Sequence, residues 1–251
     1  MPLLPSLGPL EMTVVAGDGL VLKGVLEYPD SPAGERYPLA VLAHQYPSTA
    51  DSYAPLIQDL LDLGVATLAF DERGHGSSVQ APGGTLVIDT PVGFGMEAFG
   101  PAFMSSAKKV GFERIADDIL RVASWGAVQN FVDASRLLLV GASVGGTGVL
   151  LAAPTIRGLR GVVTFGAAGA PVHGADAAER IGANVRAIGV PVLLTSSEDD
   201  PFESGKNARA WAEGAPEAAA KVVPGAEHAM AIYYDVRDEV RGFVRRALGV
   251  E

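Results

Sequence analysis

The stretch LLLVGASVGG, residues 137–146, decides the fold class of this chain. Its apolar first half is typical of a buried strand, and a glycine-rich turn and a segment suited to a helix follow. Gly141 and Gly145 would leave room where a tight turn brings the backbone close to its neighbours. Such a turn between a strand and a helix would lift the hydroxyl of Ser143 above the sheet.

Apolar runs alternate with amphipathic segments over the rest of the chain. The runs are LAVLAH (39–44), VATLAF (65–70), RLLLVG (136–141), GVVTFGAA (161–168) and PVLLTSS (191–197). They show no alternation in polarity, which suits strands buried on both faces of a parallel sheet. The intervening segments place apolar residues at helical spacing. We therefore expect an α/β fold with a doubly wound, mostly parallel sheet, begun by an antiparallel hairpin around Asp18-Gly19.

Composition restricts the classes of function. The absence of cysteine excludes thiol catalysis, disulfides and cysteine-based metal sites, and it fits a cytoplasmic location. A formal net charge of −10 argues against a nucleic-acid partner, which needs a basic surface. Without a run of eighteen apolar residues, no membrane span is expected. The first twelve residues hold three prolines and no basic residue, so we expect an extended strap rather than a secretory signal.

Candidate reactive groups follow the ends of the apolar runs. The carboxyl ends of parallel strands form the active edge of such a sheet, and Ser143 lies at one of them. A serine hydroxyl is a poor nucleophile at neutral pH and needs an adjacent base. His228 occupies a loop before the last predicted helix, where it could be that base. The acid that orients a histidine would come from one of the three carboxylates of residues 198–200.

Four segments of the chain together resemble the α/β-hydrolase superfamily, over nearly the full length from about residue 12. They are VLAHQYPST (41–49), LAFDERGHGSS (68–78), LLLVGASVGG (137–146) and LLTSSEDDPF with GAEHAM (193–202 and 225–230). The resemblance implies an eight-stranded α/β-hydrolase fold in which Ser143 is the nucleophile and His228 the base. The family acid usually lies three residues after a glycine. Ser197 stands in the place of that glycine, so the resemblance selects Asp200.

The resemblance also implies an oxyanion role for the loop after the first central strand. The family pattern there is usually H-G-x, whereas this chain has His44-Gln45-Tyr46. The backbone amides of Tyr46 and Val144 would be the two donors. The Gln45 side chain would either contact the substrate or brace the loop. His44 and His75 belong to recurrent turns of the family, and we interpret both as structural.

Residues 79–112 form a connection that is longer than an ordinary loop. We expect a lid-like flap or a short helical insert that walls an apolar acyl pocket, and the alternative is a segment packed on the domain without substrate contact. The expected substrate-binding residues are Gln45, Tyr46, Phe94, Met96, Phe99, Phe103 and Met104. His173 follows a strand end and could line the pocket, but a surface position is expected. No histidine pair has metal-ligand spacing.

The sequence therefore predicts one domain, residues 1–251, that is a serine hydrolase without cofactor or metal. Its expected partner is a small-molecule carboxylic ester of short to medium acyl chain, cleaved through an acyl-enzyme. The alternatives are a same-fold hydrolase of lactones, thioesters or peptides, and a non-catalytic binding module. The sequence leaves the oligomeric state open.

Overall fold

The computed structural model describes residues 8–29, 36–93 and 95–251. Residues 1–7 of the expected strap, and Phe94, lie outside the described residues. The strands are β1 (Leu10–Val15), β2 (Val21–Glu27), β3 (Tyr37–Ala43), β4 (Ala66–Phe70), β5 (Gln80–Ala81), β6 (Gly84–Thr85), β7 (Val132–Ala142), β8 (Leu159–Phe165), β9 (Val192–Ser197) and β10 (Ala218–Val223). The helices are α1 (Ala54–Asp62), α2 (Gly95–Val110), α3 (Ile115–Ala127), α4 (Val144–Ala152), α5 (Ala177–Ala187), α6 (Ser204–Ala212) and α7 (Tyr233–Leu248).

The strands form one mixed sheet in the order β10-β9-β8-β7-β3-β4-β2-β5-β6, and β1 pairs with β2. The pairs from β10 to β4 are parallel, and the pairs that involve β1, β2, β5 and β6 are antiparallel. The expected mostly parallel sheet with an antiparallel start is thus confirmed. Within the described residues the sheet has ten strands instead of the expected eight, because β5 and β6, of two residues each, add a hairpin beside β2 within the 79–112 connection.

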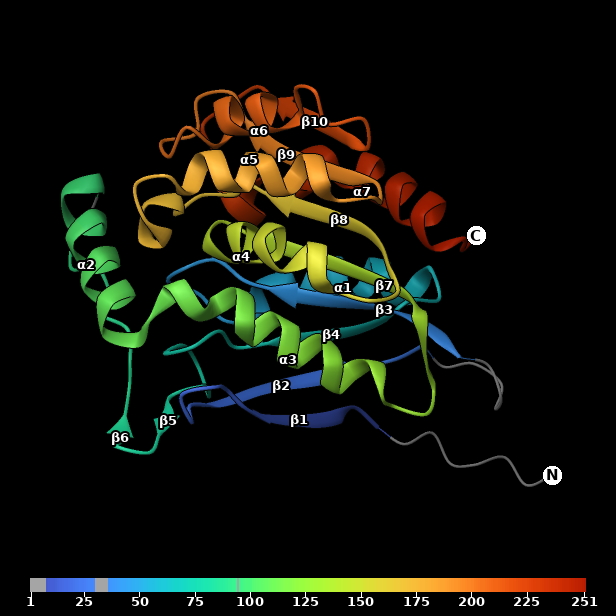
Figure 1. Cartoon of the computed structure of the whole chain (residues 1–251), viewed down its shortest axis with the longest axis horizontal. Coiled ribbons are helices and arrows are strands. Elements are labelled where there is room, and N and C mark those ends of the chain that lie inside the picture. The colour runs from blue at the N-terminus through green and yellow to red at the C-terminus, as the bar shows by residue number, and fades with distance from the viewer. Residues whose placement is uncertain (1–7, 30–35, 94) are drawn as a thin grey trace.

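Helices cover both faces of the sheet (Figure 1). Each face has its own apolar core. α1 and α7 pack on one face, and α3, α4, α5 and α6 pack on the other. Successive residues of β3 alternate between the two cores: Leu39 and Val41 belong to the second, and Ala40 and Leu42 to the first. A strand buried on both faces must be apolar at every position, which explains the unbroken runs in the sequence.

A polar cluster around the buried Asp59 joins α1 to the first half of α7, the helix that follows the His228 loop. The Asp59 carboxylate accepts hydrogen bonds of 2.6 Å from Arg237 and Arg241, and another from the Tyr233 hydroxyl. These partners, Arg237 foremost, lower the pKa of Asp59 to about 2 although burial opposes the shift. The cluster therefore anchors the helix that follows the His228 loop.

Candidate active site

Ser143 lies on a sharp turn between β7 and α4. Its φ of 51° and ψ of −116° fall outside the usual regions for a residue with a side chain, so the surrounding structure must impose them. The Ser143 N–H donates to the carbonyl of Phe165 at 2.9 Å, and the Ala168 N–H donates to the Ser143 carbonyl at 3.0 Å. The end of β8 thus holds the serine backbone in this conformation.

Glycine is required on both sides of the serine. A Cβ added to Gly141 would lie 2.4 Å from the carbonyl oxygen of Gly145. A Cβ added to Gly145 would lie 2.3 Å from the carbonyl oxygen of Ala43, at the end of β3. Both neighbours are backbone atoms, which cannot rotate aside. Gly141 therefore lets the turn fold closely on itself, and Gly145 lets it approach the end of β3.

Ser143, His228 and Asp200 form one hydrogen-bonded series. His228 Nε2 lies 2.8 Å from Ser143 Oγ, and His228 Nδ1 lies 2.6 Å from Asp200 Oδ2. Ser143 and Asp200 are buried, and His228 is partly exposed. If His228 donates its Nδ1–H to the carboxylate, the lone pair of Nε2 faces the serine hydroxyl. This arrangement can remove the hydroxyl proton during nucleophilic attack.

Of the three neighbouring carboxylates, the structure brings only Asp200 to His228. Asp199 is exposed, and Glu198 is exposed and pairs with Arg209. Burial alone would raise the pKa of Asp200, but hydrogen bonds, chiefly the one from His228, leave that pKa below its ordinary value. Asp200 is therefore an anion that can orient the imidazole and stabilise its cation.

Three contacts of this site escaped the sequence reasoning. Gly166, with φ of +56°, would place a Cβ 3.0 Å from His228 Nδ1, so a side chain there would crowd the base. The Ser197 hydroxyl donates to the carbonyl of Glu227 at 2.5 Å and ties the end of β9 to the His228 loop. The Phe202 N–H donates to Asp200 Oδ1 at 2.8 Å. Gly166 and Ser197 stand at strand ends, a position that could have marked both.

The loop His44-Gln45-Tyr46 is held by the side chain of His44. His44 Nδ1 bonds the carbonyl of Gln45 at 2.9 Å, and the Glu72 N–H donates to His44 Nε2 at 2.9 Å. The Oε1 of Gln45 is buried and has no hydrogen-bond partner among the described residues, and both roles considered for this side chain stay predictions. Val144 is the first residue of α4. The oxyanion roles of the Tyr46 and Val144 amides stay predictions.

The expected substrate-binding residues of α2 fall into two groups. The rings of Phe99 and Phe103 each lie 5.4 Å from the ring of Tyr46, measured between centroids. The Tyr46 hydroxyl also donates to the carbonyl of Asp89, in the segment before α2. Met96 and Met104 are 48% and 52% exposed. Their role, like that of the whole 79–112 lid, stays a prediction.

Residues 35–174, more than half of the chain, match the family described as "Serine aminopeptidase, S33". The chain belongs to this α/β-hydrolase family. The matched range includes Ser143 and the His44-Gln45-Tyr46 loop, whereas Asp200 and His228 lie beyond it. No curated protein matches this hydrolase. Among the described residues, none of its helices is long and apolar enough to cross a membrane.

Solved structures share the fold of this hydrolase. A structure of Est1E from Butyrivibrio proteoclasticus with ferulic acid bound has a TM-score of 0.70 at 19% identity, covering 95% of this chain and 99% of that one. A highly thermostable carboxyl esterase from Bacillus coagulans has a TM-score of 0.67 at 14% identity, and the match covers 98% of this chain and 99% of that one. A dienelactone hydrolase from Anabaena variabilis has a TM-score of 0.65 at 18% identity, and the match covers 96% of this chain and 99% of that one. At these identities the likeness shows the fold alone.

The hydrolase has three other histidines, His44, His75 and His173. They lie outside the hydrogen-bonded series of Ser143, His228 and Asp200. Burial lowers the pKa of His44 to about 4, and burial together with the nearby His44 lowers that of His75 to about 3. Both rings are therefore neutral at pH 7. His173, expected at the surface, is partly buried in the short 3-10 helix after β8, and burial lowers its pKa too.

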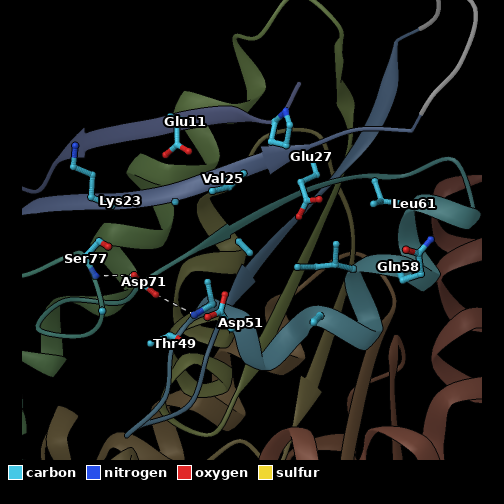
Figure 2. A pocket seen from close by; sticks show the side chains of 17 residues that line it. Glu11, Lys23, Val25, Glu27, Thr49, Asp51, Gln58, Leu61, Asp71 and Ser77 are labelled. Carbon is cyan, nitrogen blue, oxygen red and sulfur yellow. Dashed lines mark hydrogen bonds between the residues drawn. The ribbon is translucent and has the colours of Figure 1, made fainter. Parts of the chain in front are cut away.

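The hydrolase also has an open groove of about 830 Å³ between the N-terminal hairpin and the α1 region. Figure 2 shows Glu11, Lys23 and Glu27 of the hairpin on one side and Asp51 and Gln58 of the α1 region on the other. None of its lining residues belongs to the Ser143–His228–Asp200 series. The groove is a separate surface feature.

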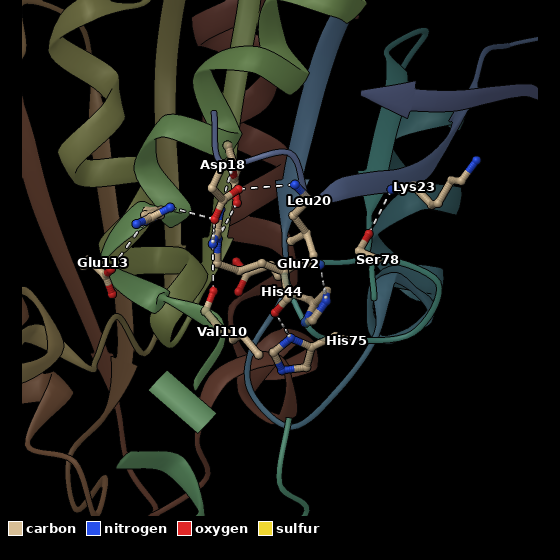
Figure 3. A network of polar contacts seen from close by, with 12 residues as sticks. Asp18, Leu20, Lys23, His44, Glu72, His75, Ser78, Val110 and Glu113 are labelled. Carbon is tan, nitrogen blue, oxygen red and sulfur yellow. Dashed lines mark hydrogen bonds and ion pairs between the residues drawn. The ribbon is translucent and has the colours of Figure 1, made fainter. Parts of the chain in front are cut away.

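Glu72 follows β4, and its backbone N–H bonds His44 (Figure 3). Its carboxyl group is buried, and the two carboxyl oxygens have no hydrogen-bond partner among the described residues. Burial, followed by the charge of Asp118, raises the pKa of Glu72 well above its ordinary value of 4.5. As the pH rises above 4.5, the unfolded chain releases this proton before the folded chain does. The folded state then binds more protons, so the free energy of unfolding falls with rising pH.

We expect Glu72→Gln, which cannot ionise, to remove the fall in the free energy of unfolding that the wild type shows between pH 5 and pH 8. Glu72→Met also removes the unpartnered polar atoms, and it should raise the free energy of unfolding at pH 8 by about 1–3 kcal/mol. Chemical denaturation of the wild type and both variants across this pH range measures the effect. An unchanged pH slope in Glu72→Gln would show that the buried carboxyl is not the titrating group.

Proposed function

We propose that this α/β hydrolase cleaves carboxylic esters of short to medium acyl chain through an acyl-enzyme intermediate. The observation that carries the proposal is the series Asp200–His228–Ser143, with contacts of 2.6 and 2.8 Å. It combines an activated hydroxyl, a base and an acid that orients the base, on three loops at the carboxyl edge of the sheet. A purely binding protein would have no need for Ser143 in its strained conformation.

The reaction would proceed in two halves. His228 Nε2 takes the proton of Ser143 as Oγ bonds to the acyl carbon, and the leaving alkoxide receives that proton when the ester C–O bond breaks. Water then attacks the acyl carbon and gives a proton to His228. The bond between the acyl carbon and Oγ breaks, that proton returns to Ser143, and a carboxylic acid leaves. Asp200 stabilises the imidazolium, and the Tyr46 and Val144 amides would hold the oxyanion.

The substrate would be apolar near its acyl carbon. Phe99 and Phe103 of α2 lie against Tyr46, whose amide is the proposed oxyanion donor. The carboxyl esterase of B. coagulans, which shares the fold, supports an ester as the substrate class. Cleavage of the N-terminal residue of a peptide is a second candidate, because the family is described as a serine aminopeptidase.

Labelling with a fluorophosphonate, followed by peptide mass spectrometry, tests the proposal. We expect modification of Ser143 and hydrolysis of p-nitrophenyl esters with a maximum at short or medium chain length. Ser124→Ala, at an exposed serine, is the matched control and should label like the wild type. Folded protein that hydrolyses an aminoacyl p-nitroanilide but no ester would favour the peptidase. Failure to label Ser143 would contradict serine catalysis altogether.

A further inference from the structure

Phe202 lies in the turn between β9 and α6 and touches both supporting members of the proposed triad. Its backbone N–H holds Asp200 Oδ1 at 2.8 Å, which leaves Oδ2 facing His228. Its ring centroid lies 4.4 Å from that of the His228 imidazole, with a tilt of 51°. Because the imidazole is partly exposed, the ring covers a side that water would otherwise reach. The ring also restricts rotation of the imidazole.

The same ring contacts the helix of the 79–112 connection. Phe99 of α2 lies 5.1 Å from Phe202 between centroids, and Phe99 in turn lies 5.4 Å from Tyr46. A continuous row of aromatic rings therefore runs from His228 through Phe202 and Phe99 to the loop of the proposed oxyanion donor. Displacement of α2 would remove the support on the outer side of Phe202.

We propose that Phe202 is a positioning residue that holds His228 and Asp200 in reacting geometry and connects them to α2 through Phe99. The proposal rests on the proposed serine-hydrolase function for its kinetic consequences, whereas its geometric content is independent of any activity. Small misplacements of a catalytic group lower the rate strongly, so support of the imidazole should act on kcat more than on KM.

The kinetic test compares Phe202→Leu, Phe202→Tyr and Phe99→Leu on a p-nitrophenyl ester. We expect Phe202→Leu to lower kcat about tenfold with KM within about twofold, and Phe202→Tyr, which keeps the ring, to stay close to the wild type. Phe99→Leu should lower kcat less. The double variant Phe99→Leu/Phe202→Leu should lose less than the product of the two single losses. Part of the effect of Phe99 passes through Phe202, whereas its contact with Tyr46 acts separately.

Phe131→Leu is the matched control, since this partly buried ring precedes β7 and Ser143 follows its other end. Equal kcat in Phe202→Leu and Phe131→Leu would overturn the positioning role. A double variant whose loss equals the product of both single losses would overturn the connection to α2.

A spectroscopic readout separates this proposal from the proposed function. The proton of the His228 ring that bonds Asp200 should give a downfield NMR signal, absent in His228→Asn. We expect the signal to broaden or vanish in folded Phe202→Leu and to persist in Phe202→Tyr. This result supports the positioning role even where the wild type neither labels nor hydrolyses esters, which would refute the proposed function alone. A signal unchanged in Phe202→Leu overturns the positioning role.

Discussion

Replacement of Ser143 by alanine should lower kcat for ester hydrolysis by about four to six orders of magnitude. Ser143 Oγ is the atom that His228 Nε2 faces at 2.8 Å, and alanine offers no other nucleophile there. Alanine would adopt the same backbone conformation with the same strain, so the free energy of unfolding should change by less than about 1 kcal/mol. Steady-state kinetics and chemical denaturation measure the two effects separately.

A second replacement distinguishes a cooperating set from independent groups. His228→Ala should cost about as much as Ser143→Ala, and the double variant should lose no more than either single variant, because each change already disables the same proton transfer. Ser124→Ala, at an exposed serine, is the control for unrelated effects of removing a hydroxyl. Losses that multiply in the double variant, or a Ser143→Ala variant that keeps more than about 1% of kcat, would contradict the assignment.

Replacement of Arg73 by methionine should lower the free energy of unfolding by about 3–5 kcal/mol. Arg73 is 1% exposed and donates to both carboxylate oxygens of Asp118, at 2.7 and 3.1 Å, as well as to Asp18 and the carbonyl of Val110. Asp118 is 2% exposed, so loss of the guanidinium leaves a buried carboxylate without its partner. Methionine keeps the apolar part of the side chain, which restricts the change to the guanidinium charge and its hydrogen bonds.

Arg209→Met is the matched control for this second prediction. Arg209 pairs with Glu198, and both side chains are half exposed, so its loss should cost less than about 1 kcal/mol. Denaturation in urea at neutral pH compares the two variants. The double variant Arg73→Met/Asp118→Leu should recover part of the loss, because it removes the unpaired charge as well. Equal losses of the free energy of unfolding in Arg73→Met and Arg209→Met would mean that the buried ion pair contributes no more to stability than the exposed one.

The sequence was sufficient to predict the sheet because its signals are local. Unbroken apolar runs mark strands covered on both faces, and the 137–146 stretch marks the turn that carries Ser143. The same patterns missed β5 and β6, since strands of two residues have no periodicity to detect. The predicted order of serine, acid and histidine corresponds to side chains that the structure brings within hydrogen-bond distance.

The residues that support this series were harder to find. The contact of Phe202 with His228 joins loops that follow two different strands, and nothing in the sequence near Phe202 announces it. The same holds for Ser197, whose hydroxyl meets the carbonyl of Glu227. Such contacts depend on where the loops after two different strands lie relative to each other. The residue type at either position does not specify this relative position.

Residue chemistry along the chain was enough to establish the α/β class, the serine turn and the residue types at the carboxyl edge, because backbone sterics and hydrophobic periodicity act between near neighbours. Residue chemistry alone left three carboxylates open at 198–200, and the family resemblance selected Asp200. The folded structure brings Asp200 to His228 and turns Glu198 to Arg209. It also separated the apolar residues of α2 into Phe99 and Phe103 against Tyr46 and the half-exposed Met96 and Met104. Which side of a helix is covered depends on the surface it meets, and that surface is assembled from strands and loops far apart in the sequence.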